Sequence, residues 1–267
     1  MAGLSATDVR VVLCDADGNL FPSEEPAFVA SADVTNRLLA SLGVERRYTA
    51  EWLLATTTGR NFRTTAVDLA VANGVTVDPG LRGAPAPAGA GRPALTAAAL
   101  DDWVAEEKSV VSAYLGRVLR PDPEVREPLR RLAEHYLLAA VSSSALSRLD
   151  DCFRATGLAD LLPPDRRFSA EDSLPRPTSK PDPAVYRFAV ERLGVPPSQA
   201  VAVEDSLPGV QSAVAAGIPT VGNLMFVPPA DRDARRALFV DAGVAVVVQS
   251  WSELAESLLD ASAPRPR

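Results

Sequence analysis

Short apolar segments alternate with helical segments over most of the chain. Five segments are mostly apolar, as strands buried on both faces of a sheet are: residues 9–14, 137–141, 200–203, 220–222 and 244–248. Apolar positions recur at helical spacing in residues 183–193 and 206–216, and a glycine, Gly194 or Gly217, follows each of these segments. This alternation predicts an α/β fold with a Rossmann-like three-layer core, in which helices cover both faces of a central parallel sheet.

The alternation stops between residues 21 and 120. Helical spacing covers residues 34–42, 51–55, 62–72 and 97–119, and no strong strand pattern lies between them. The chain is therefore predicted to carry an all-helical domain, residues 21–120, inserted into a core made of residues 1–20 and 121–267.

The composition is that of a folded chain, with 47% apolar and 23% charged residues. The 27 basic and 34 acidic residues give a net charge of −7, which argues against a general nucleic-acid binder. No segment approaches the roughly 18 apolar residues of a membrane-spanning helix, so no membrane partner is expected. The two cysteines are too few for a disulfide framework, and the first residues do not resemble a secretion signal. We therefore expect free thiols and a cytoplasmic protein.

Charged and polar residues follow three of the predicted strands directly. Because the carboxyl ends of parallel strands meet at one edge of a sheet, these side chains are expected to converge. Four carboxylates brought together need a counter-charge, and their hard oxygen atoms indicate Mg²⁺. A lysine in the loop before the helix at residue 183 would make the site attractive to a phosphate dianion. The residues concerned are Asp15, Asp17, Ser142, Lys180, Glu204 and Asp205.

Four segments that contain these residues resemble, in order and spacing, the four motifs of the haloacid dehalogenase-like hydrolases. They are VVLCDADGNL (11–20), VSSS (141–144), SKPDPAVY (179–186) and VEDSLPGVQSAVAAGI (203–218). Within that superfamily the chain is similar to the phosphatase and β-phosphoglucomutase-like branch, whose helical cap is inserted after the first motif. The resemblance implies a sheet with the first-motif strand at its centre and a four-helix cap over roughly residues 21–120.

The resemblance also implies roles for the acidic residues. Asp15 would be the nucleophile that accepts the phosphoryl group, and Asp17 would be the acid and then the base. Asp15, the backbone carbonyl of Asp17 and Asp205 would hold Mg²⁺, with Glu204 acting through a water molecule. An acid at position 17 indicates an alcohol leaving group, since dehalogenases and phosphonate-cleaving members lack an acid there.

The remaining motif residues would bind phosphate. The resemblance implies that Ser142, Ser143 and Lys180 hold the phosphate oxygens while charge develops on them. Three serines in a row leave the identity of the phosphate ligand open, although the first after the apolar run is the natural choice. Ser144 is predicted to cap the next helix.

Two positions depart from the pattern of the family, and two arginines are candidates for specificity. Asn19 stands where threonine is usual, and its amide can still donate a hydrogen bond. Ala27 stands where sugar-phosphate mutases of this branch usually carry a histidine, which lowers the odds of mutase activity. Arg60 and Arg63 lie between two helical segments, where this branch places a substrate-reading loop, although a solvated turn in an arginine-rich chain explains them equally well.

Taken together, these features predict a Mg²⁺-dependent phosphatase that hydrolyses a small phosphorylated metabolite, such as a sugar phosphate, through an aspartyl-phosphate intermediate. A sugar phosphomutase and a catalytically quiet binding or regulatory protein on the same scaffold are the alternatives. The expected partner is the phosphorylated metabolite alone, and the chain is expected to be a monomer or a weak homodimer.

Overall fold

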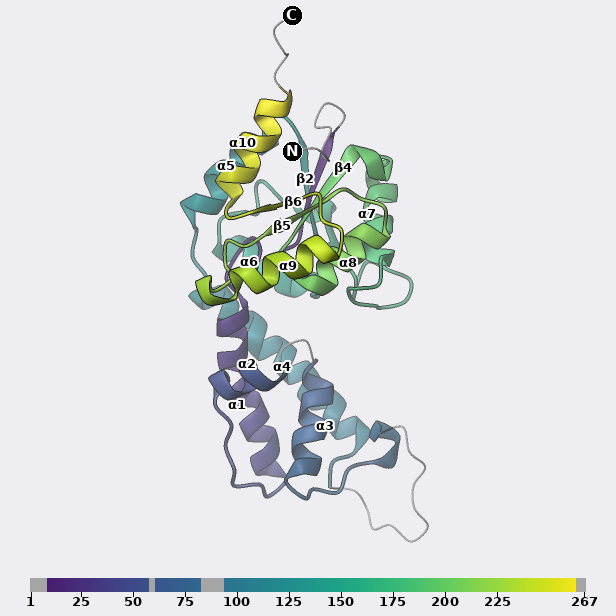
Figure 1. Ribbon diagram of the computed structural model, residues 1–267. Coiled ribbons are helices and arrows are strands. Elements are labelled where there is room, and N and C mark those ends of the chain that lie inside the picture. The colour runs from purple at the N-terminus through teal and green to yellow at the C-terminus, as the bar shows by residue number, and fades with distance from the viewer. Residues whose placement is uncertain (1–8, 58–60, 83–93, 263–267) are drawn as a thin grey trace, which may run out of the picture. The chain divides into compact units, whose positions relative to one another are not determined.

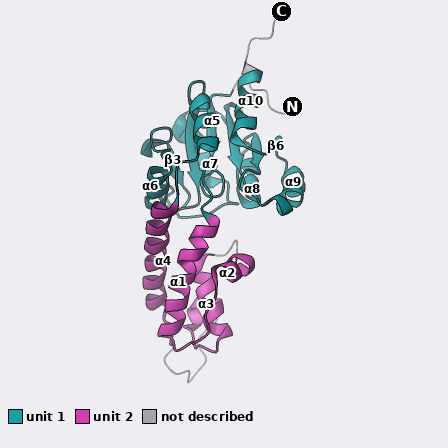
Figure 2. Cartoon of the chain, turned by 90° about the vertical axis from the view of Figure 1, so that its left-hand side faces the viewer, with its two compact units in different colours: residues 1–23, 119–267 teal, residues 24–118 magenta. Residues whose placement is uncertain are grey.

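A computed structural model describes residues 9–57, 61–82 and 94–262 of the chain. The chain divides into two compact units (Figure 2), one formed by residues 1–23 and 119–267 and the other by residues 24–118. The junctions lie close to the predicted boundaries at residues 20/21 and 120/121. Among the described helices, none is both long and apolar enough to cross a membrane.

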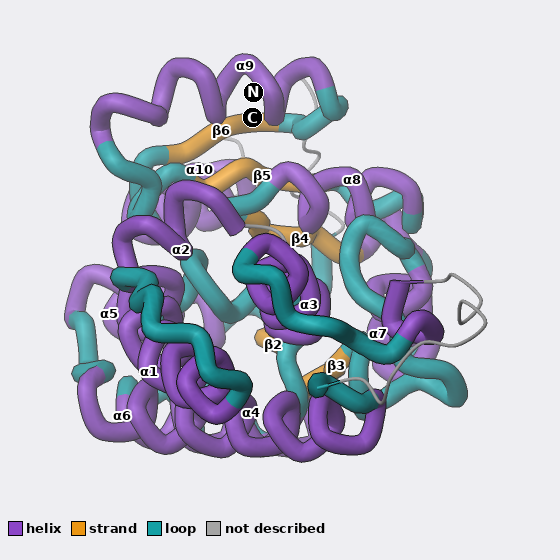
Figure 3. The backbone as a smooth tube through the Cα atoms, turned by 90° about the horizontal axis from the view of Figure 1, so that it is seen from below, coloured by secondary structure: helices purple, strands orange, loops and turns teal. Residues whose placement is uncertain are grey.

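A six-stranded parallel sheet forms the centre of the larger unit, in the order β3-β2-β1-β4-β5-β6. Figure 3 shows the labelled strands following one another across this unit. β1 lies between β2 and β4, so that Val11 pairs with both Leu137 and Ala200. The strands are β1 (Val11–Cys14), β2 (Leu137–Ser142), β3 (Arg167–Ser169), β4 (Ala200–Glu204), β5 (Thr220–Asn223) and β6 (Val246–Val248).

Helices cover both faces of this sheet (Figure 1). On one face α5 (Pro123–Ala133) packs against β2, α10 (Trp251–Ser262) packs against β6, and the two helices contact each other. On the opposite face lie α7 (Ala184–Leu193) and α8 (Leu207–Ala215). α6 (Leu146–Ala155) contacts β3, and α9 (Arg232–Asp241) contacts α8 and β6. The predicted α/β, Rossmann-like three-layer core is confirmed.

β3 is the strand that the apolar pattern did not predict, because its segment is short and opens with an arginine. Arg167 is nevertheless buried: its Nε donates to the Leu162 carbonyl oxygen at 2.6 Å, and its guanidinium pairs with Asp150. The same guanidinium lies 4.6 Å from the centre of the Phe153 ring. A buried arginine needs such partners, and they come from elsewhere in the chain.

The smaller unit is built from four α-helices, α1 (Glu24–Ser41), α2 (Ala50–Thr57), α3 (Phe62–Ala72) and α4 (Ala97–Val118). Their buried faces meet in one apolar cluster that includes Leu38, Leu53, Leu69 and Leu100. α3 begins at a side-chain cap, since the Asn61 side chain accepts a hydrogen bond from the Thr64 amide at 2.8 Å. Short 3-10 helices complete the two units: η2 (Pro79–Arg82), η3 (Pro164–Arg166), η4 (Pro197–Gln199) and η5 (Pro229–Asp231).

Candidate active site

Three carboxylates meet at the carboxyl ends of β1 and β4. Asp15 follows β1, and its amide continues the sheet by donating to the Val203 carbonyl oxygen at 3.0 Å. One carboxylate oxygen from each of Asp15, Glu204 and Asp205 lies within 4.8 Å of the other two. Residues some 190 positions apart in the sequence are therefore brought to one place by the pairing of β1 with β4.

Lys180 is buried among these acids, with only 6% of its side chain exposed. Its ammonium group forms an ion pair with Asp15 and lies 2.7 Å from Glu204 Oε1 and 2.8 Å from the Val141 carbonyl oxygen. An ammonium group has three protons to donate, and these three acceptors use all of them. Lys180 thus acts here as a counter-charge to two carboxylates, and its predicted contact with phosphate stays a prediction.

Burial and neighbouring charge oppose each other at Asp15. Burial, with the negative charges of Glu204 and Asp17, raises the pKa of the Asp15 carboxyl to about 8, although Lys180 acts to lower it. Burial acts to lower the pKa of Lys180, but Asp15 and Glu204 outweigh it and hold that pKa above its ordinary value. Lys180 therefore keeps its proton, and a further positive charge beside Asp15 would favour the ionised carboxylate.

Asp17 is held by two hydroxyl groups. Ser23 Oγ donates to Asp17 Oδ1 and Ser144 Oγ donates to Asp17 Oδ2, both at 2.7 Å. The prediction that Ser144 caps the following helix is wrong: the N-cap residue of α6 is Ala145, which makes no side-chain hydrogen bond, and the Leu146 amide donates to Asp172 Oδ2 at 2.7 Å. The Ser144 hydroxyl instead donates to the carboxylate of Asp17, which follows the neighbouring strand β1. The local sequence around Ser144 does not reveal this partner.

The other two serines of the VSSS segment order the loops around the site. Ser142 Oγ accepts a hydrogen bond from the Ser144 amide at 3.0 Å, and Ser143 Oγ accepts one from the Lys180 amide at 3.1 Å. The second contact ties the segment after β2 to the loop that carries Lys180. The predicted roles of Ser142 and Ser143 as phosphate ligands stay predictions.

Asn19 is fully buried and joins the first motif to two neighbouring elements. Its amide nitrogen donates to the carbonyl oxygens of Asp15 and Val203, both at 3.0 Å. Its side-chain oxygen accepts from Asn223, and its backbone oxygen accepts from the Trp251 indole nitrogen, both at 2.9 Å. The sequence identified Asn19 as an unusual residue but did not predict its contacts with Asn223 and Trp251.

Two glycines leave room for the carboxylates of the fourth motif. A Cβ at Gly209, near the N-terminus of α8, would lie 1.8 Å from Glu204 Oε2. A Cβ at Gly18, whose φ is +76°, would lie 2.3 Å from Asp205 Oδ2. Glu204 is held on its other oxygen by the Tyr186 hydroxyl, at 2.5 Å from Oε1. The absence of a side chain at Gly209 and Gly18 thus leaves room for the carboxylates of Glu204 and Asp205.

Gly209→Ala is expected to destabilise the protein by about 1–3 kcal/mol, because the added methyl group overlaps the buried carboxylate of Glu204. Helix propensity alone predicts the opposite sign. Urea unfolding measures the effect, with Gln211→Ala at an exposed position of the same helix as the control. A more stable Gly209→Ala variant would show that Glu204 does not need this space.

The donor set fits a hard divalent cation. All candidate ligands are oxygen atoms, as Mg²⁺ prefers. Three carboxylates face one ammonium group, so a divalent ion would balance the charge when all three are ionised. Glu204 Oε2 is buried and has no hydrogen-bond partner among the described residues, which is a further sign that this cluster is incomplete without a cation.

The two predicted specificity arginines have different outcomes. Arg60 lies outside the described residues. Arg63 lies in the first turn of α3, and its guanidinium pairs with Asp101 of α4 on the surface of the helical unit. This ion pair gives Arg63 a role within that unit, and its predicted contact with substrate stays a prediction.

A family model for haloacid dehalogenase-like hydrolases matches residues 9–217. The chain belongs to this family. As the resemblance implied, the strand that carries the first motif of this haloacid dehalogenase-like hydrolase lies inside the sheet.

Several known proteins are similar to this family member. A CBBY-like protein of Arabidopsis thaliana is 36% identical over 98 residues, which cover 35% of this chain and only 30% of the relative. A haloacid dehalogenase family hydrolase of Deinococcus radiodurans, solved with phosphate and sodium, has a TM-score of 0.63 at 25% identity and covers 98% of this chain and all of its own. CbbY of Rhodobacter sphaeroides, solved with xylulose-(1,5)bisphosphate, has a TM-score of 0.62 at 22% identity, with 92% and 96% covered.

Proposed function

We propose that this hydrolase is a Mg²⁺-dependent phosphatase that acts on a small phosphorylated metabolite through an aspartyl-phosphate intermediate. One observation carries the proposal: two carboxylates two residues apart at the end of β1 have different surroundings. Asp15 is buried beside Lys180, whereas Asp17 is partly exposed and is held by two hydroxyl groups. Different surroundings are what a nucleophile and a proton carrier require.

In the first step a carboxylate oxygen of Asp15 attacks phosphorus, and the bond between phosphorus and the leaving alcohol oxygen breaks. Asp17, protonated at that stage, gives its proton to the departing alkoxide. In the second step Asp17 removes a proton from water, the resulting hydroxide attacks phosphorus, and the bond to Asp15 breaks to release phosphate. Ser23 and Ser144 keep the Asp17 carboxylate oriented through both steps.

The carboxylates of Asp15 and Asp205 and the backbone carbonyl of Asp17 would hold the Mg²⁺ ion, and Glu204 would act on it through a water molecule. When bound, the ion supplies positive charge that offsets the charge of the phosphate and of the carboxylates. Lys180 contributes to the same charge balance through its ion pair with Asp15.

A phosphomutase remains the alternative activity on this scaffold. The methyl group of Ala27 cannot carry a proton between substrate hydroxyls, so hydrolysis is favoured over transfer. CbbY was solved with a sugar bisphosphate, which makes sugar phosphates the first class to assay. Release of inorganic phosphate supports a phosphatase, transfer to a second hydroxyl supports a mutase, and neither activity in the presence of Mg²⁺ would support a quiet binding protein.

Removal of metal is expected to lower hydrolysis of p-nitrophenyl phosphate by at least about 100-fold, because the carboxylate cluster would then repel the phosphate dianion. Addition of Mg²⁺ beyond the chelator should restore the rate. Mg²⁺ should also raise the melting temperature of the wild type but not that of Asp205→Asn, since a ligand that binds only the folded state stabilises it. Full activity in excess chelator would exclude the metal from the mechanism.

A further inference from the structure

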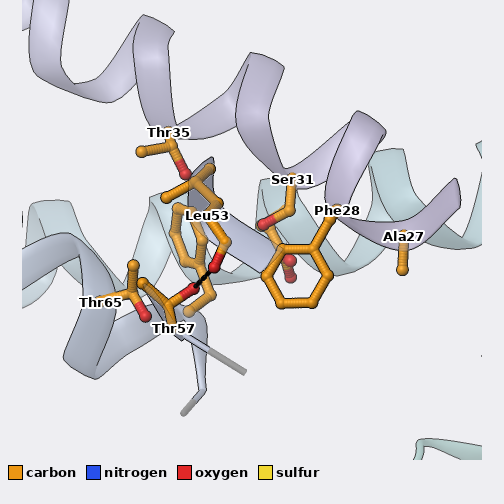
Figure 4. A pocket seen from close by; sticks show the side chains of 9 residues that line it. Ala27, Phe28, Ser31, Thr35, Leu53, Thr57 and Thr65 are labelled. Atoms are coloured by element: carbon orange, nitrogen blue, oxygen red, sulfur yellow. Dashed lines mark hydrogen bonds between the residues drawn. The ribbon is translucent and has the colours of Figure 1, made fainter. Parts of the chain in front are cut away.

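Buried polar side chains of this protein bond either within one element or between distant elements. In the helical unit, at the pocket shown in Figure 4, the Thr57 hydroxyl donates to the Leu53 carbonyl oxygen at 2.7 Å, which is a bond within α2. In the larger unit, Asn19 is instead bonded to Asn223 and to Trp251, which lie 204 and 232 positions further along the chain. Bonds of the second kind help to determine how the elements of the core meet.

Asn223 and Trp251 stand at the ends of two elements of the larger unit. Asn223 is the last residue of β5 and is 1% exposed, and Trp251 is the first residue of α10 and is fully buried. Asn223 Nδ2 donates to Asn19 Oδ1, and Trp251 Nε1 donates to the Asn19 carbonyl oxygen, both at 2.9 Å. Both residues lie outside residues 9–217, which match the family model, so that match assigns them no role.

Asn223 determines which way the Asn19 side-chain amide points. The Met225 backbone amide can only donate, and it donates to Asn223 Oδ1 at 3.0 Å, so Nδ2 is the atom of Asn223 that faces Asn19. Asn19 therefore turns its side-chain oxygen toward Asn223 and its NH2 group in the other direction. That group donates to the carbonyl oxygens of Asp15 and Val203, both at 3.0 Å. A reversed amide would bring its oxygen against these two carbonyl oxygens, with no proton between them.

The Asn19 side chain in turn connects the ends of β1 and β4. The Val203 carbonyl oxygen accepts from the Asp15 backbone amide and from Asn19 Nδ2, each at 3.0 Å. The second proton of the same NH2 group binds the Asp15 carbonyl oxygen. Asp15 directly follows β1, and Glu204 directly follows Val203 in β4. The place of Asp15 beside Glu204 therefore depends on a side chain with two donor protons on one nitrogen atom, whereas a threonine hydroxyl has only one.

We propose that Asn223 and Trp251 are positioning residues for the reaction. They act through Asn19 to hold the backbone of Asp15, so that its carboxylate keeps the position from which it attacks phosphorus. The inference rests on the proposed phosphatase function. A misplacement of about 1 Å can lower the rate of an enzyme about 100-fold. Loss of either contact should therefore lower kcat/KM by more than the loss of a buried hydrogen bond elsewhere in the core.

The kinetic test uses Asn223→Leu, which keeps the approximate shape of the side chain and removes its donor and its acceptor. With Mg²⁺ and p-nitrophenyl phosphate, kcat/KM should fall at least about tenfold. The control is Thr220→Val in the same strand: Thr220 is 1% exposed and its hydroxyl donates to the Ile218 carbonyl oxygen at 2.8 Å. This variant should stay within about twofold of the wild type. Urea unfolding checks that both variants fold, and a folded Asn223→Leu variant as active as the control would overturn the proposal.

Two further variants test the route through Asn19. Trp251→Phe keeps an aromatic ring and removes the N–H donor, so it should lower kcat/KM at least about threefold, and it decides the question if Asn223→Leu does not fold. The double variant Asn19→Thr, Asn223→Leu should be no slower than the slower of its two single variants, because both changes break the same contact. Losses that multiply in the double variant, or an unchanged rate in Trp251→Phe, would contradict this route.

A measurement without metal or substrate separates this inference from the catalytic one. The backbone amide of Asp15 donates to the Val203 carbonyl oxygen. Its NMR signal should shift in Asn223→Leu and in Trp251→Phe and stay in place in Thr220→Val. Failure of the wild type to hydrolyse any phosphate ester would refute the phosphatase assignment and leave this result to decide the positioning. An unmoved Asp15 signal in the first two variants would refute the positioning even in an active phosphatase.

Discussion

Asp15→Asn is expected to reduce hydrolysis of p-nitrophenyl phosphate by at least about 1,000-fold, because an amide cannot replace the attacking carboxylate. The fold should persist, since the substitution keeps the shape of the side chain and removes a buried charge, while Lys180 retains Glu204 as a partner. Steady-state phosphate release measures the loss, and circular dichroism checks the fold.

The matched control is Asp151→Asn, on the exposed side of α6, which should keep the full rate. Rapid mixing adds a second readout, since a covalent route predicts that wild-type protein quenched in acid retains phosphate whereas Asp15→Asn does not. A variant at position 15 with an undiminished rate would remove Asp15 from the chemistry.

Lys180→Met is expected to destabilise the protein by about 3–5 kcal/mol at pH 8 without metal, because it leaves the buried carboxylates of Asp15 and Glu204 without their cation. Urea unfolding in the presence of a chelator measures this. Lys108→Met, at the other lysine of the chain and on an exposed face of α4, should stay within about 0.5 kcal/mol of the wild type.

The loss should depend on pH in a defined direction. Burial raises the pKa of Asp15 in the folded state to about 8, so between its unfolded pKa and that value the folded protein binds more protons than the unfolded chain. Stability from this group therefore falls as pH rises through that window. Without Lys180 the folded pKa is higher still, so the deficit of Lys180→Met should grow as pH rises past about 8 and should be smaller at pH 5 than at pH 9. An equal deficit at both values would show that unpaired carboxylates are not its cause.

The sheet and the gathering of its acids followed from simple features of the sequence. Buried parallel strands are apolar along their whole length, and their ends are marked by the first charged residues. Asp15 and Asp205 could therefore be predicted to converge from the ends of two strands, and the structure brings their carboxylates together. The sequence did not predict β3 because Arg167 interrupts its apolar character. The burial of the Arg167 side chain depends on its contacts with Asp150 and with the Leu162 carbonyl oxygen.

The sequence by itself determined the α/β core, the helical insertion and the set of acids at the strand ends, since these depend on periodicity and on residue type. Tertiary structure alone decided that Ser144 binds Asp17 and that Gly209 makes room for Glu204. These contacts join side chains from different elements. Their formation depends on distances of a few ångströms between backbones, and a linear pattern of apolar and polar residues does not encode such distances.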